Sequence, residues 1–189
     1  QTALKAVTNA IELFESAAAA SPSDILLDHL FFAEQGAGVI FAGLLRPQEA
    51  IEHFQKSHQW ASRLGEQTTN SDTRNRSAAM KGWARGNIGD MLVRMDRSEE
   101  AITNYILPEL ARVRELGTTD ESPNIWDVWD LKGVNENLGM AYYRLERYQE
   151  ALPYLREALR FIEVINKRPV HSAGMASALA VVRAELGEL

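Results

Sequence analysis

The chain of 189 residues contains no cysteine, only 6 prolines and 12 glycines, and few aromatic residues. Without cysteine, disulfide bonds, thiolate nucleophiles and cysteine-ligated zinc are excluded, so burial of apolar side chains must hold the fold together. The low content of glycine and proline argues against a low-complexity or disordered chain. No apolar run approaches the roughly 18 residues that cross a bilayer, so we expect no membrane segment.

Basic residues are in the minority, with 20 Lys and Arg against 26 Asp and Glu and a net charge of −6. Because nucleic-acid affinity comes largely from cations that neutralise phosphates, this balance argues against a nucleic-acid partner. The chain begins at Gln1 without a methionine or a cleavable signal, so we expect it to be a piece of a longer protein. We expect a soluble, cytoplasmic protein, although the absence of cysteine does not itself determine the compartment.

What the chain does contain is an internal repeat of about fifty residues. The motif R-x-[QE]-E-A-[IL] occurs at residues 46–51, 97–102 and 147–152. Its alanines, which are 51 and 50 residues apart, are Ala50, Ala101 and Ala151. Twelve residues before them, with the same spacing, lie Gly38, Gly89 and Gly139. A large apolar residue follows each glycine by three positions and each alanine by four.

These positions predict a helical hairpin in each repeat. The apolar spacing is helical over residues 26–45, 78–95 and 125–145, and the motif that follows each stretch begins a second helix. A glycine in the first helix that faces an alanine in the second lets the two backbones approach closely. The glutamate before each alanine lies in the first turn, where the helix dipole favours a carboxylate. One hairpin cannot bury its own apolar side, whereas stacked hairpins can.

The helix boundaries divide the chain, as a single domain, into five segments. They are a helix at 2–19, repeats at 24–64, 74–116 and 123–167, and a last helix at 171–187. The expected fold is therefore all-α, with about eight antiparallel helices in one right-handed superhelix.

Glycine and proline supply the boundary signals. Gly65 and Gly117 are expected to end helices. Two Ser-Pro pairs, at residues 21–22 and 122–123, are expected to begin them. Pro108 is the one proline that we expect to disturb a helix, with a kink near Leu107.

The repeats resemble the tetratricopeptide repeat, whose pattern places Leu-Gly, Tyr, Ala, Phe and Ala along two antiparallel helices. The residues that match best lie in the third repeat: Leu138, Gly139, Tyr142, Ala151, Leu155 and Ala158. The period exceeds the family's 34 residues by about 16, which implies longer helices and connections. Residues 88–92 and 97–101 are also similar to repeats appended to bacterial serine/threonine kinases and regulators, where they act as sensory or docking extensions.

The resemblance implies that ligands bind to the inner face of the first helices. Carried over by position, this face holds in repeat one Phe32, Gln35, Val39 and Ala42. In repeats two and three the implied peptide-binding groove consists of Trp83, Asn87, Asp90, Arg94, Glu136, Asn137, Met140, Tyr143 and Arg144. Asn87 aligns with Asn137, and in the family an asparagine at this position often bonds a ligand backbone.

Arg94 and Arg144 also occupy equivalent positions one repeat apart. The two guanidinium groups could pair bidentately with acidic groups of an extended ligand. The alternative is that both arginines pair with neighbours such as Asp90 and Glu136 and leave the groove empty.

No group of residues points to catalysis or to a cofactor. The four histidines, which lack the i, i+4 spacing of a helical metal-binding pair, are His29, His53, His58 and His171. Carboxylates between residues 120 and 130 fit an acidic helix start better than a catalytic pair. Arg74, Lys81 and Arg85 share a helix face that could receive a phosphate or an acidic peptide, with a solvated face as the alternative.

We therefore expect a non-catalytic protein-protein interaction module that binds a peptide or a partner helix in its concave groove. The resemblance to kinase extensions implies a sensory or docking part of a larger bacterial signalling protein. The alternative is a structural role, in which the ends of the superhelix associate with a second copy to form a homodimer.

Overall fold

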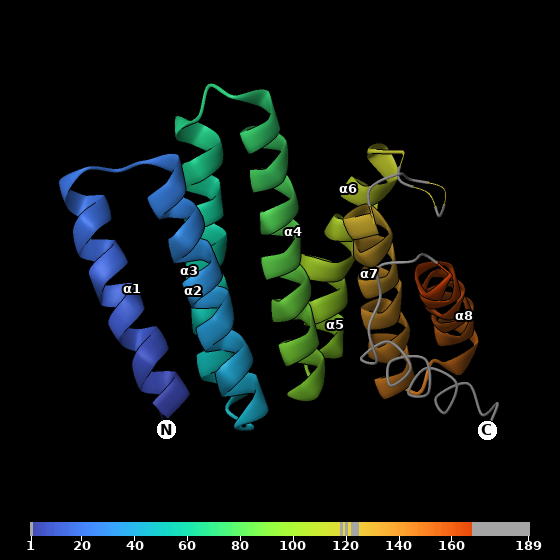
Figure 1. Ribbon diagram of the computed structural model, residues 1–189. Coiled ribbons are helices and arrows are strands. Elements are labelled where there is room, and N and C mark those ends of the chain that lie inside the picture. The colour runs from blue at the N-terminus through green and yellow to red at the C-terminus, as the bar shows by residue number, and fades with distance from the viewer. Residues whose placement is uncertain (1, 118, 120, 122–124, 168–189) are drawn as a thin grey trace. The chain divides into compact units, whose positions relative to one another are not determined.

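The computed structural model describes residues 2–117, 119, 121 and 125–167, and its regular elements within these ranges are all helical (Figure 1). The all-α prediction is confirmed. The chain divides into two compact units, unit 1 (Gln1–Met95) and unit 2 (Asp96–Leu189). The helix expected at 171–187 and the Ser-Pro pair at 122–123 lie outside the described residues. The single right-handed superhelix of eight helices remains a prediction.

Unit 1 contains four helices, α1 (Thr2–Ala20), α2 (Asp24–Gly43), α3 (Pro47–Gln67) and α4 (Ser71–Arg94). α2 packs along α1 and α3, α3 packs along α4, and α2 also contacts α4. α2 and α4 are thus the first helices of consecutive repeats, and α3 joins them from one side. This is the hairpin predicted for repeat one, followed by the first helix of repeat two.

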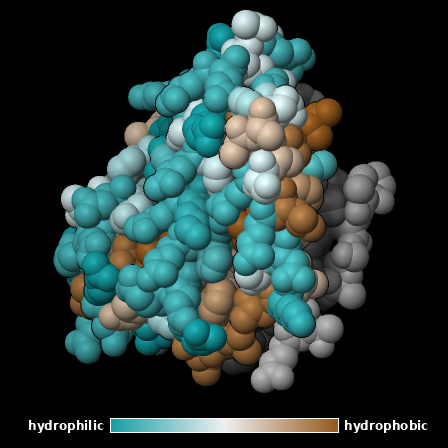
Figure 2. Space-filling view, turned by 90° about the vertical axis from the view of Figure 1, so that its left-hand side faces the viewer, coloured by the Kyte–Doolittle hydropathy of each residue, from teal (hydrophilic) through white to brown (hydrophobic). Residues whose placement is uncertain are grey.

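The outermost helix of unit 1 is α1, which agrees with the helix predicted at 2–19. Ile11 and Ala18 are buried, and the exposed side chains of α1 are small or polar apart from Leu13. Figure 2 turns this side toward the viewer, and hydrophilic side chains cover most of it. Within unit 1, α1 therefore packs on α2 through one face and presents a largely polar face on the other side.

Unit 2 contains α5 (Ser98–Ala101), the π-helical turn η1 (Ile102–Ile106), α6 (Leu107–Glu115), α7 (Ile125–Arg144) and α8 (Tyr148–Asn166). α7 packs along α8 and also contacts α5, η1 and α6. α7 and α8 form the hairpin predicted for repeat three. The elements α5, η1 and α6 form one continuous second helix of repeat two.

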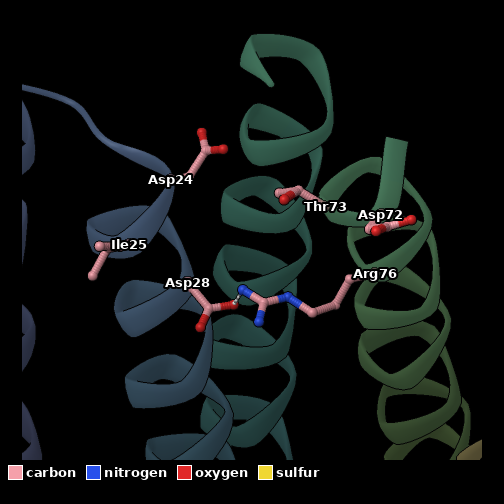
Figure 3. Close-up of a pocket in the computed structure, with 6 residues that line it drawn as sticks. All are labelled: Asp24, Ile25, Asp28, Asp72, Thr73 and Arg76. Atoms are coloured by element: carbon pink, nitrogen blue, oxygen red, sulfur yellow. Dashed lines mark hydrogen bonds and ion pairs between the residues drawn. The ribbon is translucent and has the colours of Figure 1, made fainter. Parts of the chain in front are cut away.

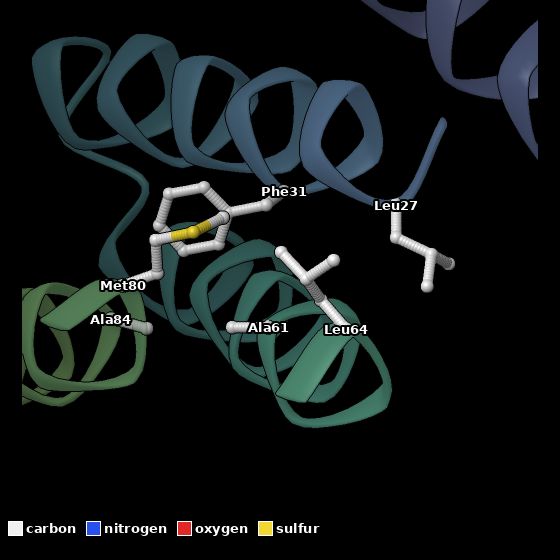
Figure 4. Close-up of a cluster of buried hydrophobic side chains, with 6 residues drawn as sticks. All are labelled: Leu27, Phe31, Ala61, Leu64, Met80 and Ala84. Carbon is white, nitrogen blue, oxygen red and sulfur yellow. The ribbon is translucent and has the colours of Figure 1, made fainter. Parts of the chain in front are cut away.

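The core of unit 1 lies where its three repeat helices meet. The fully buried side chains of this cluster, two from each helix, are Leu27, Phe31, Ala61, Leu64, Met80 and Ala84 (Figure 4). The members of each pair are three or four residues apart, which places them on one helix face. Because a fully buried large apolar side chain contributes about 1.5–3 kcal/mol, this contact stabilises the stacking of α2, α3 and α4.

Gly38 and Gly139 lie where the helices of a hairpin approach closely, as predicted, but the predicted alanines are not their nearest partners. A Cβ on Gly38 would lie 2.4 Å from the ring of Phe54. A Cβ on Gly139 would lie 2.7 Å from Cδ2 of Leu155 and 3.1 Å from its backbone nitrogen. In both hairpins the glycine therefore accommodates the large residue that follows the motif alanine by four positions.

The arginine that opens each motif has a structural role. Nε of Arg46 donates to Glu49 at 2.7 Å, and Nε of Arg97 donates to Glu100 at 2.8 Å. Arg147 and Glu150 form the equivalent ion pair, which lowers the pKa of the Glu150 carboxyl. The motif glutamate thus pairs with this arginine, and its carboxylate is also stabilised by the helix dipole.

The turn between the two helices of each hairpin uses a left-handed residue. These residues are Leu45, Asp96 and Glu146, whose φ angles are 57°, 58° and 58°. They are 51 and 50 residues apart, which is the spacing of the repeat. In repeats one and three the turn is a Schellman motif, because the Arg46 N–H donates to the Phe41 carbonyl and the Arg147 N–H to the Tyr142 carbonyl, both at 3.0 Å. Sequence analysis missed these turns, since none of the three residues is glycine.

Two of the predicted boundary signals were wrong. Gly65 does not end a helix, because α3 continues to Gln67. A Cβ on Gly65 would lie 2.4 Å from Oγ of Ser77, so this glycine permits the close approach of α3 and α4. The N-cap of α2 is Ser23, and not Ser21 of the Ser-Pro pair at 21–22.

The other boundaries agree more closely. α4 begins at Ser71, three residues before the predicted start of repeat two. Gly117 has φ of 65° and follows the end of α6 as predicted.

Pro108 disturbs the helix before it as predicted. The N–H of Leu107 donates to the carbonyl of Ile102, five residues back, which makes residues 102–106 a π-helical turn. Because a proline ring crowds the carbonyl four residues earlier and has no N–H, the wider turn relieves this crowding. Pro153 also lies inside a helix, and α8 continues through it as α-helix from Tyr148 to Asn166.

α2 also corrects the statement that no apolar run approaches the length of a membrane span. Among the described residues, α2 is the one helix that is both long enough and apolar enough to cross a membrane, by length and composition alone. The core helix of a soluble protein passes the same test, and α2 packs against α1, α3 and α4.

Replacing Gly139 by alanine tests the hairpin contact. We expect Gly139→Ala to lower the free energy of unfolding by about 1–3 kcal/mol, because the new Cβ meets the side chain and backbone of Leu155. The control is Gly133→Ala in the same helix, where a Cβ meets nothing within 4 Å and the better helix former adds up to about 1 kcal/mol. Urea denaturation followed by circular dichroism measures both. A shift of the same sign in both variants contradicts the contact.

The left-handed turn makes a second prediction. Leu45→Gly should raise the free energy of unfolding by about 0.5–1 kcal/mol, because glycine adopts this backbone without Cβ strain and the leucine side chain is exposed. Leu44→Gly is the neighbouring control, with φ of −84°, and should lower it by a similar amount. Thermal denaturation measures the stability of both variants. A Leu45→Gly variant that is less stable than the parent chain would refute the strain argument.

Candidate peptide-binding surface

The structure brings together two of the implied ligand-face residues on neighbouring first helices. Nδ2 of Asn87 on α4 donates to Oε1 of Gln35 on α2 at 2.7 Å. Nε2 of Gln35 donates to Oγ of Ser57 on α3 at 2.8 Å. Because one amide links three helices, the faces of α2 and α4 beside it have a defined relative position. The carbonyl oxygen of Asn87 has no hydrogen bond to the described residues and can accept one from a ligand.

Beside this link α2 exposes a line of apolar side chains, which we call the α2 stripe. Its members, spaced by seven residues, are Ile25, Phe32 and Val39, and 69%, 50% and 61% of their surface is exposed. Seven residues are nearly two helical turns, so the three side chains share one face. Phe32 and Val39 were among the implied ligand-face residues, and the spacing of seven could have identified Ile25.

The α2 stripe runs between side chains that bind the two neighbouring helices. Asp28 forms an ion pair with Arg76 of α4. The ring of His29 lies 5.2 Å from the ring of Phe14 on α1. The stripe is therefore bordered on both sides by residues whose own contacts hold them in place.

The other implied residues of α4 already have contacts within unit 1. Trp83 packs against the core cluster, with its ring 6.3 Å from that of Phe31, so it supports the fold and is only partly exposed. Asp90 and Arg94 form an ion pair at 2.9 Å, one turn apart on the helix. Both side chains are substantially exposed, and such pairs contribute about 0–1 kcal/mol, so a ligand carboxylate could replace Asp90 at little cost.

The implied residues of unit 2 lie on α7. Glu136 forms an ion pair with Lys132 rather than with an arginine. Arg144 is exposed and makes no ion pair with the described residues of unit 2. Tyr143 is partly exposed and packs edge-on against Tyr148, with ring centroids 5.4 Å apart. The two arginines thus differ in their pairing, since Arg94 has an acidic partner.

Asn137 and Met140 are half-buried on the same helix, and Asn137 has a partner within the structure. The predicted groove combines residues of unit 1 with residues of unit 2, and the contacts within either unit do not test it. It therefore remains a prediction.

At the N-terminal ends of α2 and α4 lies an open pocket of about 390 Å³ (Figure 3). Its lining residues are Asp24, Ile25, Asp28, Asp72, Thr73 and Arg76. Oδ2 of Asp24 accepts a hydrogen bond from the hydroxyl of Thr68 at 2.9 Å. Sequence analysis missed this pocket, because an aspartate in the first turn of a helix is common and α2 and α4 begin almost fifty residues apart.

Three of the four histidines, His29, His53 and His58, lie in the part of the chain that the structure describes. Within the described residues no group of three or more His, Asp or Glu side chains is arranged to hold a metal ion. Nδ1 of His53 lies 2.5 Å from Oε2 of Glu34, and its ring stacks on that of Phe41. Glu34 is fully buried between α2 and α3, so this pair belongs to the helix interface.

A comparison with protein-family models matches residues 136–171 to the tetratricopeptide repeat. The matched segment contains the second half of α7 and the whole of α8, and so falls on the third predicted repeat. Comparisons with curated proteins and with solved structures gave no match. Residues 136–171, which fall on the third hairpin, are thus similar to the tetratricopeptide repeat.

Proposed function

We propose that this chain is a non-catalytic interaction module that binds a peptide or a helix of another protein on the exposed faces of its first helices. A tetratricopeptide repeat indicates a role in protein-protein interaction. The observation that carries the proposal is the α2 stripe, because three large apolar side chains on one face lie at least half exposed.

The energy available from the stripe sets the kind of partner. Full burial of a large apolar side chain contributes about 1.5–3 kcal/mol, and these three are already partly buried, so covering them contributes roughly 3–4 kcal/mol in total. A micromolar complex requires about 8 kcal/mol, and association has its own entropic cost. The stripe therefore needs neighbouring polar contacts, which the carbonyl oxygen of Asn87 and the guanidinium of Arg94 can supply.

The proposed surface on α4 comprises Trp83, Asn87, Asp90 and Arg94. The corresponding face of α7 comprises Glu136, Asn137, Met140, Tyr143 and Arg144. The similarity to repeats of bacterial kinases and regulators supports a cytoplasmic module that docks or senses within a larger signalling protein. The alternative is self-association through the solenoid ends, and the exposed face of α1 offers it few large apolar side chains.

The test is a selection from a display library of random peptides against the 189-residue chain, followed by fluorescence anisotropy with a selected peptide. We expect Phe32→Gln with Val39→Gln to weaken binding at least tenfold, because the apolar contact is lost. The control is Leu13→Gln on α1, which removes a side chain that is 70% exposed and lies outside the surface.

The control variant should bind as the parent chain does, and the melting temperature should be nearly unchanged in both variants. Failure to select any peptide, or equal weakening in both variants, overturns the proposal.

A further inference from the structure

We propose that the pocket at the N-terminal ends of α2 and α4 receives a lysine or arginine side chain from the partner that covers the α2 stripe. This inference rests on the proposed function and specifies the chemistry of its ligand. The partner is a helix with apolar residues along one face and a basic residue at the end that reaches the pocket.

The charge of the pocket points to a cation. Its lining holds three carboxylates and one guanidinium, and that guanidinium, of Arg76, is already paired with Asp28. The N-termini of α2 and α4 each add about half a positive charge. Roughly one negative charge remains, and neither Asp24 nor Asp72 forms an ion pair with another described residue.

The nearest other cation of α4 does not neutralise the pocket. Arg74 is two residues from both Asp72 and Arg76, which places it about 200° around the helix from them. Its guanidinium donates to the carbonyl of Thr68 at 3.1 Å. Thr68 caps the C-terminus of α3, where the helix dipole favours a cation. Arg74 therefore compensates α3 rather than the pocket.

The shape of the pocket suits a long side chain. A space of about 390 Å³ lies within the range that binds small organic groups, and the three carboxylates are not arranged to hold a metal ion. Ile25 lines the pocket and is also the first residue of the α2 stripe. A lysine or arginine can pack its methylene groups against this isoleucine while its charge reaches the carboxylates.

The spacing of the stripe indicates a helical partner. Residues seven apart on α2 rise by about 10 Å, and a helix that runs along α2 repeats its contacts at the same interval. Apolar residues seven apart on the partner would face Val39 and Phe32. Seven residues beyond them, a basic residue would lie beside Ile25 and enter the pocket.

Two synthetic helical peptides of about 20 residues test the proposal. Both carry leucine at two positions seven residues apart, and the third position of the series is arginine in one and glutamine in the other. In about 50 mM salt we expect the arginine peptide to bind at least fivefold more tightly by fluorescence anisotropy. The difference should shrink near 0.5 M salt, because screening then acts over only a few ångströms.

Matched variants locate the cation. Asp24→Asn with Asp72→Asn should abolish the difference between the two peptides, while the amides keep a hydrogen-bond acceptor at each helix start. The control is Glu12→Gln with Glu52→Gln, which changes the net charge equally at exposed positions of α1 and α3 and should preserve the difference.

The outcomes separate this inference from the proposed function. If the peptides bind equally, or if the aspartate variant keeps their difference, the cation pocket is wrong even when Phe32→Gln with Val39→Gln still weakens both peptides. If neither peptide binds and the display library also yields no ligand, the proposed function fails as well.

Discussion

The structure of unit 1 depends on the close approach of α3 to a helix on each of its two sides. Toward α2, the ring of Phe54 lies over Gly38, where any Cβ would collide with it. Toward α4, Ser77 lies over Gly65 in the same way. These contacts bring the cluster around Phe31 into van der Waals contact from three helices at once. Each pair of helices alone would leave one side of this cluster in water, so the stacking of the helices and their folding are one process.

The same packing determines which surface remains available. Because α3 covers one side of both α2 and α4, these two first helices lie next to each other, and the hydrogen bond between Asn87 and Gln35 joins them. The opposite side of α2 has no covering helix within unit 1 and carries the stripe that includes Phe32 and Val39. The candidate site therefore follows from the order of the helices, without any irregular loop to build it.

Much of the hairpin architecture could be predicted, because two independent sets of positions repeat with the same spacing. The glycine of each pair marks a close approach of two helices, although Gly139 makes room for Leu155 and not for the predicted Ala151. The left-handed turns escaped prediction because Leu45 and its equivalents lack the glycine that usually marks this backbone. Gly65 was misread because a glycine that ends a helix and one that permits close packing look alike in sequence.

Part of the candidate site was predictable, because regular spacing in the sequence also identifies the residues that share one helix face. Periodicity along one helix identifies Phe32 and Val39, whose exposure depends on the face of α2 alone. The pocket depends on the relative position of two helices, since Asp28 and Arg76 meet across a separation of 48 residues. The ion pair of Arg94 with Asp90, one turn earlier on the same helix, was named from the sequence, whereas Glu136 pairs with Lys132 and not with Arg144. Sequence pattern reports faces, whereas contacts between faces require the packed structure.

Charge beside the stripe decides which apolar partner can use it. An exposed apolar line attracts any other apolar surface, including that of a second copy, because hydrophobic contact has little directional preference. Two copies of this chain each carry a net charge of −6, and the carboxylates of Asp24 and Asp72 lie at one end of the stripe. Contact between copies would therefore bring like charges together, whereas a basic helix gains from the same groups. The acidic residues that oppose self-association through this face are the ones that favour a basic partner.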